Sequence, residues 1–147
     1  MSRLHVCSLA RVEETVLRTR ANMLVTLLSP GTAHVRPRSI APWNHLVLGV
    51  SDIVEPLPGY VAPGREHIEQ LIEFVSAWDR ERPMLIHCFA GVSRSTAAAF
   101  IAACALAPNR SETAIALAIR DASPTATPNA RLVALADDHL ARSGRMR

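Results

Sequence analysis

The residues best suited to chemistry lie in one short stretch, residues 87–95, with the sequence HCFAGVSRS. Cys88 and Arg94 in this stretch are separated by five residues. A cysteine thiolate is a strong nucleophile, and the planar guanidinium of an arginine can hold two oxygens of an anion at once. The stretch therefore indicates covalent chemistry on an anionic group such as a phosphate.

The elements expected on either side of this stretch would place Cys88 and Arg94 at one site. Residues 84–87 are apolar on both faces and predict a short central strand of a parallel sheet, while residues 94–107 predict a buried helix. Ligands of open α/β sheets bind beyond the carboxyl ends of the strands, where the loop between these elements would lie. Loop N–H groups and the positive end of the helix would then surround the anion. The predicted substrate-binding residues are Phe89, Ala90, Gly91, Val92, Ser93 and Arg94.

Other residues of the stretch have predicted supporting roles. The helix N-terminus and Arg94 should lower the pKa of Cys88 and so favour the thiolate. Ser95 is expected to donate its hydroxyl to the sulfur and to ease its departure, although a serine there can also satisfy a helix N–H. His87 is expected to orient the loop by hydrogen bonds, and Gly91 to supply the backbone freedom that a tight loop needs.

This stretch resembles the signature His-Cys-x5-Arg-Ser/Thr of the cysteine-dependent protein tyrosine phosphatases. The ending Ala-Gly-x-Ser-Arg-Ser is most similar to that of the dual-specificity branch. The order of elements along most of the chain fits the same family, and Pro128-Asn129 resembles the element that opens its last helix. The resemblance implies hydrolysis of phosphate monoesters through a phosphocysteine intermediate, with no cofactor and no metal.

The same resemblance implies a general acid on a loop upstream of the cysteine. Asp52 lies 36 residues before Cys88 (88 − 52) and follows a predicted strand, so it should also lie at the carboxyl edge of the sheet. Glu55, in the same proline-rich loop, is the competing candidate, whereas Asp79 lies at the far end of a helix. The predicted catalytic residues are Cys88, Arg94, Asp52 and Ser95.

The whole chain predicts alternating strands and helices, followed by helices alone. Strands are expected at residues 4–7, 23–28, 45–50 and 84–87, and helices at 10–20, 66–79, 94–107, from a cap at Asn109 to Ala122, and from a cap at Thr127 to about Arg142. This order predicts an α/β fold, with a mostly parallel central sheet flanked by helices and a helical C-terminal half. We expect residues 1–147 to form a single domain of the protein tyrosine phosphatase type. The basic residues 142–147 are expected to be a frayed end.

Composition and charge narrow the range of partners. The formal net charge of +3 is diffuse, so nucleic acid is not expected as a partner. The longest apolar run is far shorter than the ~18 residues of a membrane span, and no membrane insertion is expected. Three cysteines without a CxxC pair argue against a disulfide framework or a zinc site, and favour a cytoplasmic location. The expected partner is a phosphorylated protein or a small phosphate ester, and the oligomeric state is left open.

Several functions remain open at this point. Phosphotyrosine or a broad range of phosphoproteins is the expected substrate. Phosphoinositides or inositol phosphates are an alternative in which Arg36, Arg38 and Arg65 would meet extra phosphates, although residues 89–93 carry no lysine or arginine. A sulfurtransferase would use the cysteine but would not need Asp52. A catalytically silent phosphate-binding module of this kind usually lacks the cysteine or the arginine.

Overall fold

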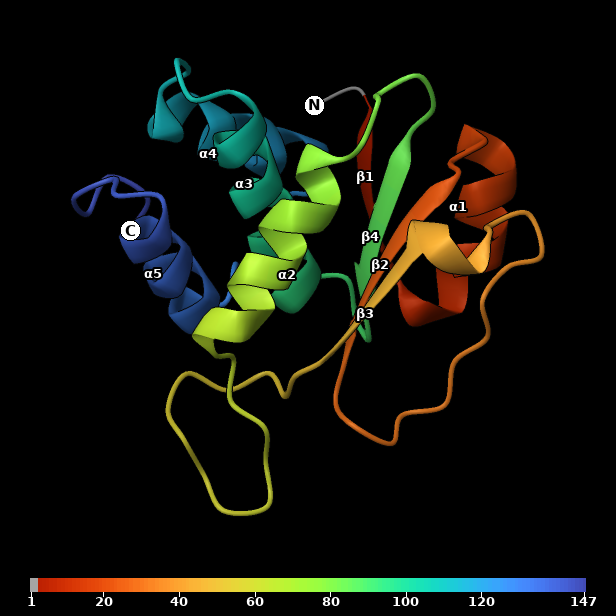
Figure 1. Ribbon diagram of the computed structural model, residues 1–147, viewed down its shortest axis with the longest axis horizontal. Coiled ribbons are helices and arrows are strands. Elements are labelled where there is room, and N and C mark those ends of the chain that lie inside the picture. The colour runs from red at the N-terminus through yellow and green to blue at the C-terminus, as the bar shows by residue number, and fades with distance from the viewer. Residues whose placement is uncertain (1–2) are drawn as a thin grey trace.

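A sheet of four parallel strands forms the centre of the computed structural model, which describes residues 3–147 (Figure 1). The strands are β1 (Leu4–Ser8), β2 (Met23–Leu28), β3 (His45–Gly49) and β4 (Met84–Cys88). Their order in the sheet is β1-β4-β2-β3, with every neighbouring pair parallel. β4 is central and buried along its whole length, as its doubly apolar sequence predicts.

The helices form two unequal layers. They are α1 (Val12–Thr19), α2 (Arg65–Ser76), α3 (Arg94–Leu106), α4 (Glu112–Ala122) and α5 (Ala130–His139), with short 3-10 turns at Leu9–Arg11 and Pro42–Asn44. Figure 1 shows α1 on one face of the sheet and the other four helices on the opposite face. A small apolar core lies under α1, and the main core lies under the larger layer. The predicted α/β fold with a helical C-terminal half is confirmed.

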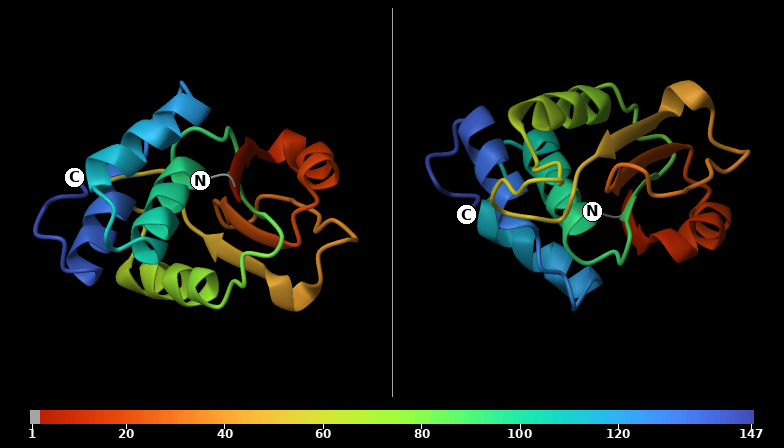
Figure 2. Two further views of the ribbon diagram at one scale, coloured as in Figure 1. Left: turned by 90° about the horizontal axis from the view of Figure 1, so that it is seen from above. Right: turned by 90° about the horizontal axis from the view of Figure 1, so that it is seen from below.

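Helix α3 is the centre of the larger layer and is buried on all sides from Arg94 to Cys104. Figure 2 shows it enclosed by the sheet and the neighbouring helices. Its alanines have no long side chains, so β4, α2, α4 and α5 can all approach it closely. This packing fixes the N-terminus of α3 directly beyond the end of β4.

No helix within residues 3–147 has the length and apolar character that crossing a bilayer requires.

Both N-caps that the sequence predicts lie further along the chain in the structure. The N-cap of α4 is Ser111, whose side chain accepts a hydrogen bond from the N–H of Ala114 (3.3 Å), whereas the prediction placed it at Asn109. The N-cap of α5 is Asn129 rather than Thr127. The N–H of Thr127 instead donates to a carbonyl of the loop before α3, and this contact delays the start of the helix.

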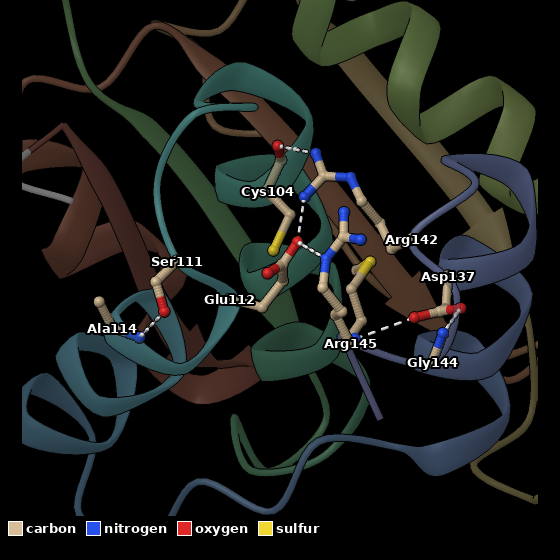
Figure 3. A network of polar contacts seen from close by, with 9 residues as sticks. Cys104, Ser111, Glu112, Ala114, Asp137, Arg142, Gly144 and Arg145 are labelled. Atoms are coloured by element: carbon tan, nitrogen blue, oxygen red, sulfur yellow. Dashed lines mark hydrogen bonds and ion pairs between the residues drawn. The ribbon is translucent and has the colours of Figure 1, made fainter.

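The expectation of a frayed C-terminus is wrong. Beyond α5 the chain folds back onto the helical layer, and Met146 is buried in the main core. The buried guanidinium of Arg142 donates to the carboxylate of Glu112 (2.6 Å) and to the carbonyl of Cys104 (2.7 Å), as Figure 3 shows. The tail is therefore ordered because it supplies the partners of polar groups that α3 and α4 leave in the interior.

Asp137 holds the same tail from the side of α5. Its two carboxylate oxygens accept the backbone N–H groups of Gly144 (2.8 Å) and Met146 (2.9 Å). Burial alone would raise the pKa of Asp137, but these N–H groups hold it below its ordinary value. The resulting contribution to stability is present at neutral pH, and it is lost as the pH falls through the pKa of Asp137 in the folded protein.

Candidate active site

The signature stretch folds into a loop at the carboxyl edge of the sheet. β4 ends at Cys88 and α3 begins at Arg94, so the intervening residues bridge a central strand and a central helix. The Cys88 sulfur lies 3.1 Å from the hydroxyl oxygen of Ser95 and accepts the backbone N–H of Gly91 (3.2 Å). The structure thus brings together the predicted nucleophile, the hydroxyl and the glycine of the loop.

Hydrogen bonds from outside the loop turn its carbonyl groups outward. Three carbonyls accept N–H groups from other segments: Phe89 from Leu9 (3.1 Å), Val92 from Thr127 (2.9 Å) and Ser93 from Asn129 (3.1 Å). In a trans peptide the C=O of one residue and the N–H of the next point in opposite directions. The N–H groups of Ala90, Ser93 and Arg94 therefore face the inside of the loop. A ring of inward N–H groups at a helix N-terminus is suited to binding an oxyanion.

Gly91 occupies a position that no other residue can fill without strain. Its φ angle is +75°, and a Cβ atom there would lie 2.8 Å from backbone atoms of Cys7 and Ser8 in β1. The loop therefore packs directly against the backbone of the neighbouring strand. Both the left-handed conformation and this close approach require glycine.

We predict that Gly91→Ala displaces the loop and lowers phosphate-ester turnover by about tenfold or more, since positive-φ strain costs about 1–3 kcal/mol before the clash is added. Gly144→Ala is the matched control, because Gly144 also has a positive φ (+86°) but has open space around its Cα. Steady-state kinetics and thermal melting of both variants separate the two effects. Equal loss of activity in the two variants would contradict a specific requirement at Gly91.

The surroundings of Cys88 favour its thiolate. Burial opposes ionisation, but the hydroxyl of Ser95 and backbone N–H groups of Ser95, Gly91 and Val92 outweigh it and lower the pKa of Cys88. Burial without such a set of donors raises the pKa of Cys7 and of Cys104 to about 11. Cys88 is therefore the cysteine whose environment is suited to nucleophilic attack.

Arg94 is buried and anchored to the residues that directly follow β2 and β3. Its Nη1 donates to the carbonyl of Val50 (3.0 Å) and to the hydroxyl of Ser29 (3.3 Å). Its Nε is buried and has no hydrogen-bond partner within residues 3–147. A buried donor without a partner is costly, and a bound oxyanion would supply the missing acceptor. With Nη1 occupied, the edge formed by Nε and Nη2 is the one that can pair with two oxygens.

Asp52 is held against the loop by two hydrogen bonds to the same oxygen. Its Oδ1 accepts the hydroxyl of Ser93 (2.8 Å) and the side-chain amide of Asn129 (2.9 Å), and that amide also donates to the carbonyl of Ile53 (3.1 Å). Because two donors occupy Oδ1, a proton on the acid form would reside on Oδ2. Glu55 is exposed and lines the same hollow of about 530 Å³ as Asp52. Only Asp52 is tied to the loop through Ser93.

Asn129 is a site residue whose role the sequence reasoning missed. It caps α5, and its backbone N–H and side-chain amide reach the loop carbonyl of Ser93 and the carboxylate of Asp52. The Pro-Asn pair was visible in the sequence, but only as the opening of a helix. Its position between the loop and Asp52 depends on contacts across 77 residues of sequence.

His87 lies behind the loop, where an orienting role was expected. Its Nδ1 lies 3.3 Å from the carbonyl oxygen of Cys88, and its Nε2 lies 2.8 Å from the hydroxyl of Thr26. Burial is the main cause that lowers the pKa of His87 to about 4. The ring is therefore neutral near neutral pH and can both donate and accept a hydrogen bond.

Exposed apolar side chains lie in the loop and on the segment that carries Asp52. Phe89 is 62% exposed at the start of the loop. Val54, Leu57 and Tyr60 are exposed on the segment between β3 and α2, drawn in yellow below α2 in Figure 1, and Val54 and Leu57 line the hollow beside Asp52. Exposed apolar groups beside a hollow are typical of a surface that contacts a ligand or partner.

Comparisons with known proteins identify the fold. No family model matches this sequence, and no curated protein matches it. Human DUSP28 matches in structure with 20% identity and a TM-score of 0.73, covering 98% of this chain and 97% of that protein. The human tyrosine phosphatase-like serine/threonine/tyrosine-interacting protein matches with 17% identity and a TM-score of 0.73, covering 97% and 94%.

A third similar structure is that of PTPMT1 in complex with PI(5)P. It has 13% identity and a TM-score of 0.66, and the match covers 98% of this chain and 96% of that protein. All three structures align over nearly the whole chain, which confirms the fold that the signature stretch predicts. The chain has the fold seen in the dual-specificity phosphatases.

Proposed function

We propose that this protein is a metal-independent phosphatase that hydrolyses phosphate monoesters through a phosphocysteine intermediate. The observation that supports this most directly is the environment of Cys88. Its pKa is lowered, and it lies at a loop of inward N–H groups that ends at an arginine whose buried Nε has no partner among the residues that the structure describes. One arrangement can thus bind the phosphate and activate the nucleophile.

In the first step, the Cys88 thiolate attacks phosphorus and the bond from phosphorus to the ester oxygen breaks. Asp52 transfers its proton to the departing oxygen, which would otherwise leave as an unstable anion. The three remaining phosphate oxygens are held by loop N–H groups and by the Nε–Nη2 edge of Arg94. These donors are fixed before the reaction begins, so they stabilise the developing charge without rearrangement.

In the second step, water attacks the phosphocysteine and the sulfur–phosphorus bond breaks. The Asp52 carboxylate accepts a proton from the water, and inorganic phosphate forms. The Ser95 hydroxyl, 3.1 Å from the sulfur, donates a hydrogen bond to the departing thiolate. The enzyme returns to its starting state with Cys88 ionised and Asp52 protonated, which balances both protons and electrons.

Phosphotyrosine or a broad range of phosphoproteins is the proposed substrate class. Exposed Phe89 in the loop and Leu57 in the hollow beside Asp52 suit an aromatic or apolar neighbour of the phosphate. Two arginines considered for polyphosphates are already engaged: Arg36 donates to a backbone carbonyl (3.0 Å) and Arg65 pairs with Glu69 (3.3 Å). A phosphoinositide is the alternative, since one protein of this fold was crystallised with PI(5)P.

The test is the release of phosphate from p-nitrophenyl phosphate, a phosphotyrosine peptide, a phosphoserine peptide and PI(5)P, each with EDTA present. We expect turnover that EDTA does not reduce, with the phosphotyrosine peptide preferred over PI(5)P. Tungstate binding without any turnover would instead support a silent phosphate-binding module. Transfer of sulfur from thiosulfate to cyanide, without phosphate release, would instead support a sulfurtransferase.

A further inference from the structure

A chain of hydrogen bonds runs from the site into the sheet. The hydroxyl of Thr26 lies 2.8 Å from Nε2 of His87 and 2.7 Å from Nε2 of His45. Thr26 and His87 are paired in register on the adjacent strands β2 and β4, and both are buried. His45 begins β3 and is partly exposed. The three side chains therefore connect three neighbouring strands directly behind Cys88.

The chemistry of these groups fixes which atom donates and which accepts in each of these hydrogen bonds. A threonine hydroxyl has one hydrogen, so Thr26 can donate to only one of the two histidines and must accept from the other. The Nδ1 of His87 faces the carbonyl oxygen of Cys88 (3.3 Å), which is only an acceptor, so Nδ1 carries the hydrogen of a neutral ring. Nε2 of His87 must then accept from Thr26. Thr26 in turn accepts from Nε2–H of His45.

We propose that Thr26 and His45 are positioning residues, which hold His87 as its Nδ1–H tautomer so that it can orient the peptide after Cys88. The carbonyl of Cys88 then points toward His87, and the N–H of Phe89 points the opposite way, into the loop. This N–H joins those of Ala90, Ser93 and Arg94. The inference rests on the proposed function in one respect, that this loop binds the phosphate of a substrate.

The protonation states of the two rings agree with this arrangement. Burial is the main cause that lowers the pKa of both His87 and His45 to about 4, so both are neutral near neutral pH. The charged or titratable groups facing His45 are His34, whose ring lies edge-on at 6.0 Å, and Arg36, and both disfavour a second positive charge. A proton added to His87 would place an N–H donor on each side of the Thr26 hydroxyl. The donor and acceptor roles in these hydrogen bonds would then have to change.

The decisive comparison is Thr26→Val against Thr26→Ser. Valine keeps the branched shape that suits a strand but removes the hydroxyl, whereas serine retains the hydroxyl. We expect Thr26→Val to lower kcat/KM for p-nitrophenyl phosphate about tenfold, the effect of losing one hydrogen bond that positions a reacting group. Thr26→Ser should remain within about twofold of the wild type, because its hydroxyl can rejoin both histidines.

Two further readouts do not depend on turnover. Long-range ¹H–¹⁵N NMR of the intact protein with labelled histidine should show His87 protonated at Nδ1 and His45 at Nε2. In Thr26→Val the His87 tautomer should become mixed. The pH midpoint for alkylation of Cys88 by iodoacetamide should rise, because the N–H of Phe89 would point less directly into the loop. A purely structural role of Thr26 would lower the melting temperature without changing the tautomer.

A second pair of variants covers the case in which Thr26→Val does not fold. His45 is partly exposed, so His45→Leu and His45→Gln should both fold, and only glutamine restores a donor to Thr26. We expect the kinetic and NMR changes in His45→Leu and their reversal in His45→Gln. Wild-type His87 protonated at Nε2, or equal behaviour of the two His45 variants, would overturn the proposal. If the tautomers are as expected but the wild type releases no phosphate, then it is the proposed function that fails.

Discussion

Replacing Cys88 by serine should reduce phosphate-ester hydrolysis by at least about a thousandfold, because the loss of a nucleophile removes the covalent path. The substitution exchanges one atom, and the loop N–H groups and Arg94 remain in place. A serine hydroxyl stays protonated in an environment that ionises a thiol, so it cannot attack phosphorus at a useful rate. The variant should still bind tungstate, measured by calorimetry, since the oxyanion donors are unchanged.

Cys104→Ala is the control for the effect of losing a buried thiol. Cys104 is buried in α3, and burial raises its pKa to about 11, so it stays protonated and unreactive. We expect this variant to lose some stability through the small cavity, yet to keep its turnover. Hydrolysis that survives in Cys88→Ser, or that disappears in Cys104→Ala, would contradict the role assigned to Cys88.

The second large effect is expected at Asp52. Asp52→Asn keeps the shape of the side chain but cannot donate a proton to the leaving group, and general acids contribute about 10²–10⁴-fold. The loss in kcat should be large for a phosphotyrosine peptide and small for an ester whose alcohol is strongly acidic, because such an alcohol leaves without protonation. Kinetics on a series of aryl phosphates would measure this dependence.

Glu55→Gln is the matched control, since Glu55 lies in the same loop and lines the same hollow. The Glu55 side chain is exposed, whereas the Asp52 carboxylate accepts hydrogen bonds from Ser93, in the loop before α3, and from Asn129. We expect this variant to retain nearly full activity and the leaving-group dependence of the wild type. The opposite result, a larger loss in Glu55→Gln than in Asp52→Asn, would transfer the acid role to Glu55.

The pH profile should be bell-shaped with its optimum in the acidic range. Activity rises as Cys88 ionises, and because its pKa lies below the ordinary thiol value, this rise occurs at lower pH than for a free cysteine. Ser95→Ala removes a hydrogen bond to the thiolate, so the rising limb should move to higher pH. The falling limb belongs to the general acid, so Asp52→Asn should lack it. A flat profile between about pH 4 and 8 would argue against this pairing of groups.

The sequence predicts the parts of the fold that depend on local patterns. β4 is apolar on both faces and α3 is rich in alanine, and the structure confirms both as central buried elements. The arrangement of Cys88, Gly91 and Ser95 follows from the same patterns, because a short loop between such elements allows few paths. The residues that form the loop could therefore be predicted from the sequence without knowing the rest of the structure.

Other features depend on contacts between distant residues and are not visible in local patterns. Arg142 pairs with Glu112 across 30 positions, which orders a tail that is basic and unremarkable in sequence. Thr26 meets His87 across 61 positions, and its role follows only from the register of β2 and β4. The sequence predicts the cap of α5 at Thr127, but the structure has it at Asn129, because the N–H of Thr127 donates to a carbonyl of the loop before α3.

The most direct test of the proposed mechanism is to trap the covalent intermediate. Wild-type protein would be mixed with p-nitrophenyl phosphate, quenched with acid within the first turnover, digested and examined by mass spectrometry. We predict a phosphoryl group on the peptide that contains Cys88, carried by the sulfur, and its absence from Cys88→Ser treated in the same way. Steady turnover with no phosphorylated Cys88, or with the phosphoryl group on another residue, would contradict a phosphocysteine mechanism.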